Sequence, residues 1–205
     1  PARWYEHYAA MDLPMPKLYD KAVRPHHPFT DEYARVVDYD THFHSPQDVR
    51  RAITGYSGLV SFMDEQMGQV LAALDQSGMA GDTLVIYTCD HGDNLGARGL
   101  WGKSTLYQES AGVPMILAGP GIPAGQVVAE PVSHVDCAVT ILQAAAAPAL
   151  AQASGQSLTD LAQGATAHRP VLSEYHAIGC TGGATLLRHG SFKYCHYVDH
   201  PAQLF

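Results

Sequence analysis

The chain has 205 residues, of which 46% are hydrophobic and 16% are charged, and these values are ordinary for a globular protein. Its formal net charge of −8 provides no basic surface for non-specific nucleic-acid binding, so we expect no nucleic-acid partner. No apolar run reaches the ~18 to 20 residues that cross a bilayer, so we expect no membrane span.

The ends of the chain and its cysteines bear on the completeness of the sequence and on its compartment. The sequence starts at Pro1 and stops within "HPAQLF", so we expect a piece of a longer protein, and a signal peptide stays an open question. Cys89, Cys137, Cys180 and Cys195 form neither a CxxC pair nor a zinc spacing. Their spacing suggests no disulfide framework, which is more typical of a reducing compartment. Localisation, cytoplasmic or periplasmic, is left open.

The first half of the chain predicts an irregular segment followed by a long helix. Residues 1–44 are rich in Pro, His and Tyr and show no sustained period. Ser45-Pro46-Gln47-Asp48 then supplies an N-cap, a proline at the first helical position and a capping-box acid. A stripe with helical spacing continues to Gly78, and its aromatic and Met side chains from Tyr56 to Met67 are predicted core.

The next elements predict an α/β fold with a mostly parallel sheet flanked by helices. Residues 83–90 and 113–119 are continuous apolar runs, typical of strands that are buried on both faces. Ser133 opens another capped helix, which we expect to reach about Ala147. Buried strands that alternate with helices favour a parallel sheet.

The pattern changes near Gly164 to short alternating segments that are joined by turn residues such as His189-Gly190. Such segments predict hairpins and a small antiparallel sheet at the C-terminus. We therefore expect two parts, residues 1–163 in the larger α/β domain and residues 164–205 at the start of a smaller, truncated subdomain.

Two segments contain residues that could carry chemistry. Asp90 and His91 end the first predicted strand, where open α/β sheets collect ligands, and Asp oxygen with His nitrogen suits a divalent metal. An aspartate that caps the following turn beside a solvated histidine explains the pair equally well. Lys103, in "GLWGKS", could hold an anion among residues that look packed, although an isolated loop lysine is usually only solvated.

The histidines His26 and His27, in "RPHHPF", lie between two prolines that restrict the backbone. A histidine held in this way can donate a proton to a leaving oxygen or hydrogen-bond an anion. A turn with surface histidines is the alternative, and the residues alone do not decide between the two.

The segment "DHGDNLGARGLWGKSTLYQESAGVPMILAGPGI" closely resembles the metal-and-lysine segment of the type I sulfatases, within the alkaline phosphatase superfamily. The helices before and after it, "GQSL" and the C-terminal "LLRHGSFKYCHYVDHPAQLF" are similar to the same family. The resemblance implies the C-terminal half of the catalytic domain and the start of the C-terminal subdomain.

Residue by residue, the resemblance implies that Asp90 and His91 bind one divalent cation, with calcium first and manganese or magnesium as alternatives. It implies that Lys103 contacts the sulfate of a small-molecule ester. His26, from the family's His-x-Pro-Phe/Tyr pattern, would bind sulfate or protonate the leaving oxygen; His27 fits less well because the proline follows it immediately. We expect these side chains to face one cavity.

The departures from the family are also informative. The family's nucleophile is a formylglycine made in a Cys/Ser-x-Pro-x-Arg motif, and no cysteine of this chain lies in one. The paired aspartates that complete the metal site precede that motif and are missing too. The resemblance therefore implies a fragment of a sulfuric ester hydrolase that is inactive alone, with formylglycine upstream.

Two other functions stay open. Relatives that hydrolyse phosphonate or phosphate esters use the same Asp-His pair and can share the lysine. A non-catalytic relative is opposed by the joint retention of His26, Asp90, His91 and Lys103. The organic group of the substrate stays open. The oligomeric state stays open too, with a homo-oligomer as one of the alternatives.

Overall fold

The computed structural model describes residues 1–166, 169–177 and 179–205. The chain divides into two compact units, each of which combines separate stretches of the sequence. The first unit contains residues 1–79, 91–112 and the described part of 177–181, and the second contains residues 80–90, 182–205 and the described part of 113–176.

Helices dominate the first unit and strands the second. The first unit holds the helices α1 (Ala2–Ala9), α2 (Pro28–Val36), α3 (Pro46–Gln76) and α4 (Gln108–Ala111), with single 3-10 turns at Tyr39–Thr41 and Ala97–Gly99. The second unit holds β1 (Val85–Thr88), β2 (Met115–Ala118), α5 (His134–Ala144), α6 (Leu158–Ala162), β3 (Val171–Tyr175), β4 (Ala184–His189), β5 (Phe192–Tyr197) and β6 (His200–Leu204), with a 3-10 turn at Ala80–Asp82. The predicted α/β class is confirmed.

The predicted starts of both long helices are confirmed by their caps. The Ser45 side chain accepts a hydrogen bond from the Asp48 N–H (3.3 Å), and Pro46 occupies the first turn of α3. At α5, Ser133 and Asp136 form a reciprocal capping box, in which the Ser133 N–H donates to Asp136 Oδ2 (2.8 Å).

The prediction of an irregular segment over residues 1–44 was wrong in two places, because α1 and α2 lie within it. Both helices are shorter than ten residues, so a period of 3.6 has little length in which to show. In α2 the signal is instead positional, since Pro28 stands in the first turn directly after the N-cap His27.

The predicted core stripe of α3 is also wrong over much of its length. Val49 and Ile53 are buried, but Tyr56 and Met63 are exposed. Within the first unit α3 packs against the short helix α1, which approaches so closely that a Cβ at Gly58 would lie 3.1 Å from the Tyr5 nitrogen. An eight-residue helix covers only a short part of a 31-residue helix.

The strands β1 and β2 correct the prediction of a mostly parallel sheet, because they pair antiparallel, with Val85 opposite Ala118 and Thr88 opposite Met115. They are also only partly buried, and Ile116 is 58% exposed. The apolar runs indicated strands but carry no information on direction. Direction follows from the connection, which leaves β1 and returns to β2 at the same end of the pair.

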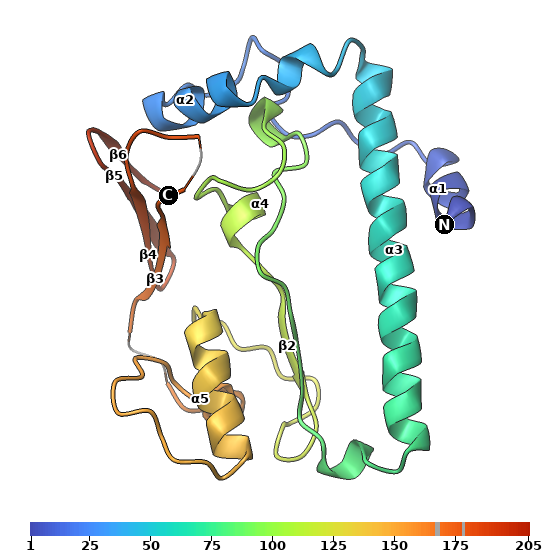
Figure 1. Ribbon diagram of the computed structural model, residues 1–205, viewed down its shortest axis with the longest axis vertical. Coiled ribbons are helices and arrows are strands. Elements are labelled where there is room, and N and C mark those ends of the chain that lie inside the picture. Colours follow the sequence, from blue (N-terminus) through green and yellow to red (C-terminus); the bar gives the residue numbers. More distant parts are fainter. Residues whose placement is uncertain (167–168, 178) are drawn as a thin grey trace. The chain divides into compact units, whose positions relative to one another are not determined.

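The predicted small antiparallel sheet at the C-terminus is confirmed, in the order β3-β4-β5-β6 (Figure 1). In β5 buried and exposed side chains alternate strictly, and Cys195 and Tyr197 face the buried side. Leu186 of β4 stands opposite Cys195, so the two buried residues occupy one face of the hairpin.

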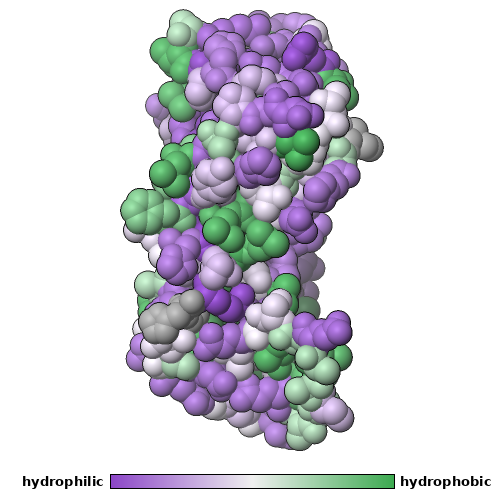
Figure 2. All heavy atoms as spheres, turned by 90° about the vertical axis from the view of Figure 1, so that its left-hand side faces the viewer, coloured by the Kyte–Doolittle hydropathy of each residue, from purple (hydrophilic) through white to green (hydrophobic). Residues whose placement is uncertain are grey.

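The core of the first unit is a small aromatic cluster in which Tyr33, Leu100 and Tyr107 are buried together. On the face drawn in Figure 2, hydrophobic side chains form separate groups between hydrophilic ones. Among the described residues, no helix is both long enough and apolar enough to span a membrane.

Candidate active site

The strand β1 ends at Thr88, two residues before Asp90, so the predicted strand over residues 83–90 is shorter than expected. Asp90 is exposed and His91 is half-buried. Asp90 is the last residue of this stretch of the second unit, and His91 begins a stretch of the first unit. We call residues 91–112 the lysine loop, because they carry Lys103. That the Asp90 and His91 side chains face one cavity stays a prediction.

Gly92 allows the two ends of the lysine loop to meet. Its N–H donates to the Ser110 carbonyl (2.8 Å). A Cβ built on Gly92 would lie 2.0 Å from the Glu109 carbonyl oxygen, which is far inside van der Waals contact. Only glycine therefore permits this approach of the backbone next to His91.

Lys103 contacts His91 directly, with 2.7 Å between Lys103 Nζ and His91 Nε2. An ammonium group can only donate, so Nε2 is the accepting nitrogen of a neutral imidazole. The other ring nitrogen, Nδ1, lies 2.8 Å from the Gly92 carbonyl oxygen and donates to it. The network thus assigns one tautomer to His91.

This tautomer fits a metal ligand. Histidine binds metals as the neutral imidazole, and a hydrogen bond from its other nitrogen to a carbonyl commonly fixes the ring. The lone pair of His91 Nε2 that accepts from Lys103 is therefore the one that could bind a cation. Asp90, the preceding residue in the sequence, remains the second predicted ligand. Within the described part of the chain, no group of three or more His, Cys, Asp or Glu side chains is arranged to hold a metal ion.

Lys103 is exposed, although it stands in a tightly bonded loop. The Asp93 carboxylate accepts from the N–H groups of Leu95 (2.7 Å) and Gly102 (3.0 Å). The buried Asn94 side chain donates to the Gly102 and Lys103 carbonyls. Sequence analysis missed Asp93 and Asn94, and the available signal was their position in a glycine-rich turn, where such side chains often bond the backbone.

A second polar cluster supports the lysine loop further along. Arg98 donates to Glu109 (3.1 Å), and its guanidinium lies 4.0 Å from the centre of the Tyr107 ring. Lys17 forms a second ion pair with Glu109. Burial raises the pKa of the Glu109 carboxyl, but Lys17 and Arg98 outweigh it and hold the pKa below its ordinary value.

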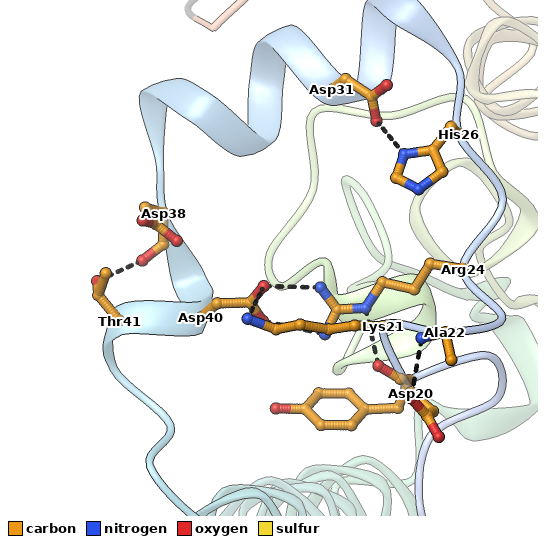
Figure 3. A network of polar contacts seen from close by, with 10 residues as sticks. Asp20, Lys21, Ala22, Arg24, His26, Asp31, Asp38, Asp40 and Thr41 are labelled. Carbon is orange, nitrogen blue, oxygen red and sulfur yellow. Dashed lines mark hydrogen bonds and ion pairs between the residues drawn. The ribbon is translucent and has the colours of Figure 1, made fainter.

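His26 lies in the segment before α2, and its side chain is exposed. Its Nδ1 is 3.5 Å from Asp31 Oδ1 (Figure 3). It helps to line a pocket of about 150 Å³ in the first unit. Arg24, Asp31, Asp40 and Arg98 also line this pocket, whereas Lys103 does not. The expectation that His26 and Lys103 share a cavity is therefore not met by this pocket.

Arg24 is the centre of the network beside His26, and sequence analysis did not single it out. It donates to both carboxylate oxygens of Asp40 (2.8 and 3.0 Å) and to the Tyr19 carbonyl (2.8 Å) (Figure 3). The hydrogen bond from Arg24 lowers the pKa of Asp40, against the effect of partial burial, and Lys21 adds to the lowering.

His27 differs from His26 in being buried, at the N-cap of α2. Its carbonyl accepts from the Thr30 hydroxyl (3.0 Å) and from the Asp31 N–H (2.9 Å), which starts the helix. The exposed histidine of the pair is thus the one that sequence analysis favoured, and its role stays a prediction.

Two family models match the chain. The model described as "Sulfatase" matches residues 21–147, which is more than half of the chain. The model described as "N-sulphoglucosamine sulphohydrolase, C-terminal" matches residues 96–202.

Relatives with sequence similarity carry sulfatase names. The chain is 34% identical over 171 residues to choline-sulfatase of Rhizobium meliloti, covering 82% of this chain and 33% of the relative. It is 31% identical over 188 residues to arylsulfatase K of Danio rerio, covering 87% and 36%. The chain spans about one third of the length of the curated relatives it matches.

Solved structures share the fold. A phosphonate monoester hydrolase from Silicibacter pomeroyi matches with a TM-score of 0.81 and 26% identity, over 97% of this chain and 46% of the other. A crystal structure described as a putative sulfatase from Bacteroides thetaiotaomicron matches with a TM-score of 0.74 and 22% identity, over 100% of this chain and 50% of the other.

Proposed function

We propose that this chain, which belongs to the sulfatase family, forms part of an enzyme that hydrolyses the sulfate monoester of a small molecule. The observation that carries the proposal is the 2.7 Å contact between Lys103 Nζ and His91 Nε2. His91 Nε2, in the tautomer that can bind a metal, thus lies beside the Lys103 ammonium, which can bind an anion. The family names of the relatives support sulfate as that anion.

In this proposal Asp90 and His91 bind one divalent cation, calcium in first place, with manganese or magnesium as alternatives. When bound, such a cation supplies positive charge close to the sulfate oxygens. Hard cations usually take six or more oxygen-rich ligands, so two protein ligands are too few. The remaining ligands would come from other segments of the longer protein or from water.

Lys103 would contact a sulfate oxygen and stabilise the charge that grows there or on the leaving oxygen in the transition state. Its ammonium donates to His91 Nε2 in this structure, and occupation of that lone pair by a cation would leave the ammonium for an anion. His26 would bind sulfate or donate a proton to the leaving oxygen. The formylglycine nucleophile of the family has no matching motif in this chain, so no step is assigned to it.

We also propose that residues 1–163 belong to the larger α/β domain and that residues 164–205 start a smaller subdomain. Among the described residues, strands β3–β6 form one sheet that is separate from the pair β1–β2, and this supports the division. Residues 167, 168 and 178 of the smaller part lie outside the described residues.

Hydrolysis of a phosphonate monoester is the second candidate, favoured by the structural match to the Silicibacter pomeroyi enzyme. The same Asp-His pair and lysine could serve either ester. Comparing kcat/KM of the full-length protein for 4-nitrophenyl sulfate and 4-nitrophenyl phenylphosphonate separates the two. A higher value for the phosphonate would replace the proposed function by the second candidate.

The role of Lys103 is tested with Lys103→Ala in the full-length protein, assayed with 4-nitrophenyl sulfate and a divalent cation. Loss of one transition-state donor typically costs ~2.7 to 4 kcal/mol of barrier, so we expect kcat to fall by about 10² to 10³. The thermal stability should hardly change, because the Lys103 side chain is exposed.

Lys21→Ala is the matched control, since Lys21 is also exposed and loses only an ion pair with Asp40. We expect it to keep the wild-type kcat. Wild-type turnover of Lys103→Ala would remove Lys103 from the site and with it the observation on which the proposal rests.

A further inference from the structure

Asn94 is almost completely buried in the lysine loop, with 1% of its surface exposed. Its side-chain Nδ2 donates to the carbonyl of Gly102 (2.8 Å) and to the carbonyl of Lys103 (3.2 Å). Its Oδ1 accepts from the Thr105 hydroxyl (3.1 Å). Both hydrogens of Nδ2 and the oxygen are therefore engaged, and the network fixes the orientation of the amide.

The backbone of Asn94 binds the same segment. Its N–H donates to the Gly102 carbonyl (2.7 Å), and the preceding Asp93 carboxylate accepts from the Gly102 N–H (3.0 Å). Asp93 and Asn94 thus hold Gly102, the residue before Lys103, and the carbonyl of Lys103 itself.

The segment that carries Lys103 needs such support, because its backbone is unusual. Gly102 and Ser104 both have φ of +67°, so Lys103 stands between two residues in the left-handed region. Ser104 is not a glycine, so a left-handed conformation costs it of order 1 kcal/mol or more and persists only where the surroundings hold it. The bonds from Asn94 and Asp93 supply those surroundings.

We propose that Asn94 is a positioning residue, which holds the peptide groups around Lys103 so that the ammonium meets His91. The proposal rests on the proposed function, in which Lys103 contacts the sulfate. The polar atoms of the Asn94 side chain bond within the lysine loop, so the proposal gives Asn94 no contact with the sulfate or the cation. Its effect on the reaction is transmitted through Lys103, and this distinguishes it from a residue that only stabilises the fold.

The transmission is tested by a double-mutant cycle in the full-length protein with 4-nitrophenyl sulfate. Misplacement of a catalytic group by about 1 Å can cost 10²-fold, so we expect Asn94→Ala to lower kcat by about 10- to 100-fold. In the Lys103→Ala background the same substitution should lower kcat no further. Thr105→Val removes one bond to Asn94 and leaves both bonds to the loop carbonyls, so its loss of kcat should be smaller.

Thr140→Val is the matched control for loss of a buried hydrogen bond. Thr140 is buried in α5 of the second unit, donates to the Asp136 carbonyl (2.6 Å) and accepts from the Leu158 N–H (2.8 Å). It contacts no residue of the lysine loop in these bonds. We expect it to lower thermal stability as Asn94→Ala does and to keep the wild-type kcat.

Hydrogen–deuterium exchange gives a second measurement that does not depend on turnover. Asn94→Ala should speed exchange at the amides of residues 102–105 and leave those of β4 and β5 protected. Unchanged exchange at residues 102–105 would overturn the inference.

The kinetic outcomes separate this inference from the function on which it rests. A loss of kcat in Lys103→Ala together with a wild-type kcat in Asn94→Ala overturns the positioning role and leaves the proposed function intact. If the losses of kcat from Asn94→Ala and Lys103→Ala multiply in the double variant, the positioning role is likewise overturned and the proposed function is left intact. A wild-type kcat in Lys103→Ala overturns both.

Discussion

In the lysine loop, the side chains of Asp93 and Asn94 bond main-chain groups of residues 95, 102 and 103, whereas strands β3–β6 are joined through their main chains. The loop is therefore specified residue by residue, and each bond has one side chain that makes it. The sheet is specified by a repeated pattern, in which pairing and alternation of burial continue from one residue to the next.

The difference explains why the two regions tolerate change differently. A strand that loses one side chain keeps its ladder of backbone bonds. A loop that loses one polar side chain loses the bonds that this side chain makes to the main chain, which lowers stability and releases the loop geometry. The position of a single atom such as Lys103 Nζ is accordingly set by individual side-chain bonds in the loop.

Gly92→Ala, in the lysine loop, is expected to lower the free energy of unfolding more than any other substitution proposed for comparing the loop with the sheet. The new Cβ would meet the Glu109 carbonyl oxygen, which belongs to the backbone and cannot move without opening the loop. We expect the free energy of unfolding of the first unit to fall by about 3 kcal/mol, the upper end for overpacked sites. Thermal unfolding, with hydrogen–deuterium exchange to locate the change, measures it.

Gly190→Ala is the control in the sheet, at the turn between β4 and β5. Gly190 has φ of +53°, and no heavy atom lies within 4 Å of the position of its Cβ. Only the left-handed backbone opposes alanine there, so we expect a loss of about 1 kcal/mol. Equal losses for the two glycines would contradict the contrast between loop and sheet.

Removal of an apolar side chain tests the sheet in the same way. Leu186 is 6% exposed and lies opposite Cys195, so Leu186→Ala should cost about 2 to 3 kcal/mol, the lower part of the usual range. Its neighbour Leu187 is 37% exposed, and Leu187→Ala should cost less than half as much. Chemical denaturation of the two variants measures the difference, and a larger loss for Leu187→Ala would contradict the assigned faces of β4.

The same contrast governs how much could be predicted from the sequence. The helices α3 and α5 were predicted from their capping residues, and strands β3–β6 from alternation and turn residues, because these signals are local and repeated. The antiparallel pairing of β1 with β2 was missed, since it depends on how the connection folds. The exposure of the α3 stripe was missed because burial depends on which elements cover the helix.

For the candidate site, the sequence predicted the residue types but not the bonds that place them. Asp90, His91, Lys103 and His26 were singled out by spacing and by resemblance. The contact of Lys103 with His91 is shown by the structure. Asn94 and Arg24 were not predicted, because a buried amide and an ion-paired arginine have no sequence period and are recognised only from their partners.

Glu109 gives the smallest predicted effect. Its carboxylate is half-buried between Lys17 and Arg98. Burial raises its pKa, but the two cations hold the pKa below the ordinary value of 4.5. A carboxyl with a lowered pKa in the folded state stabilises the fold fully above the unfolded value, and this stabilisation is lost as pH falls through the folded value.

The first unit should therefore lose stability as pH falls below 4.5, with a contribution from Glu109 that Glu109→Gln lacks. Glutamine keeps the size of the side chain and cannot ionise, so the difference in thermal midpoint between wild type and variant isolates this carboxyl. We expect the wild type to be more stable near pH 7 and the difference to shrink below pH 4.5. A difference that stays constant over that range would show that the charge of Glu109 adds nothing to the lysine loop, and that Arg98 stabilises it through its contact with Tyr107 alone.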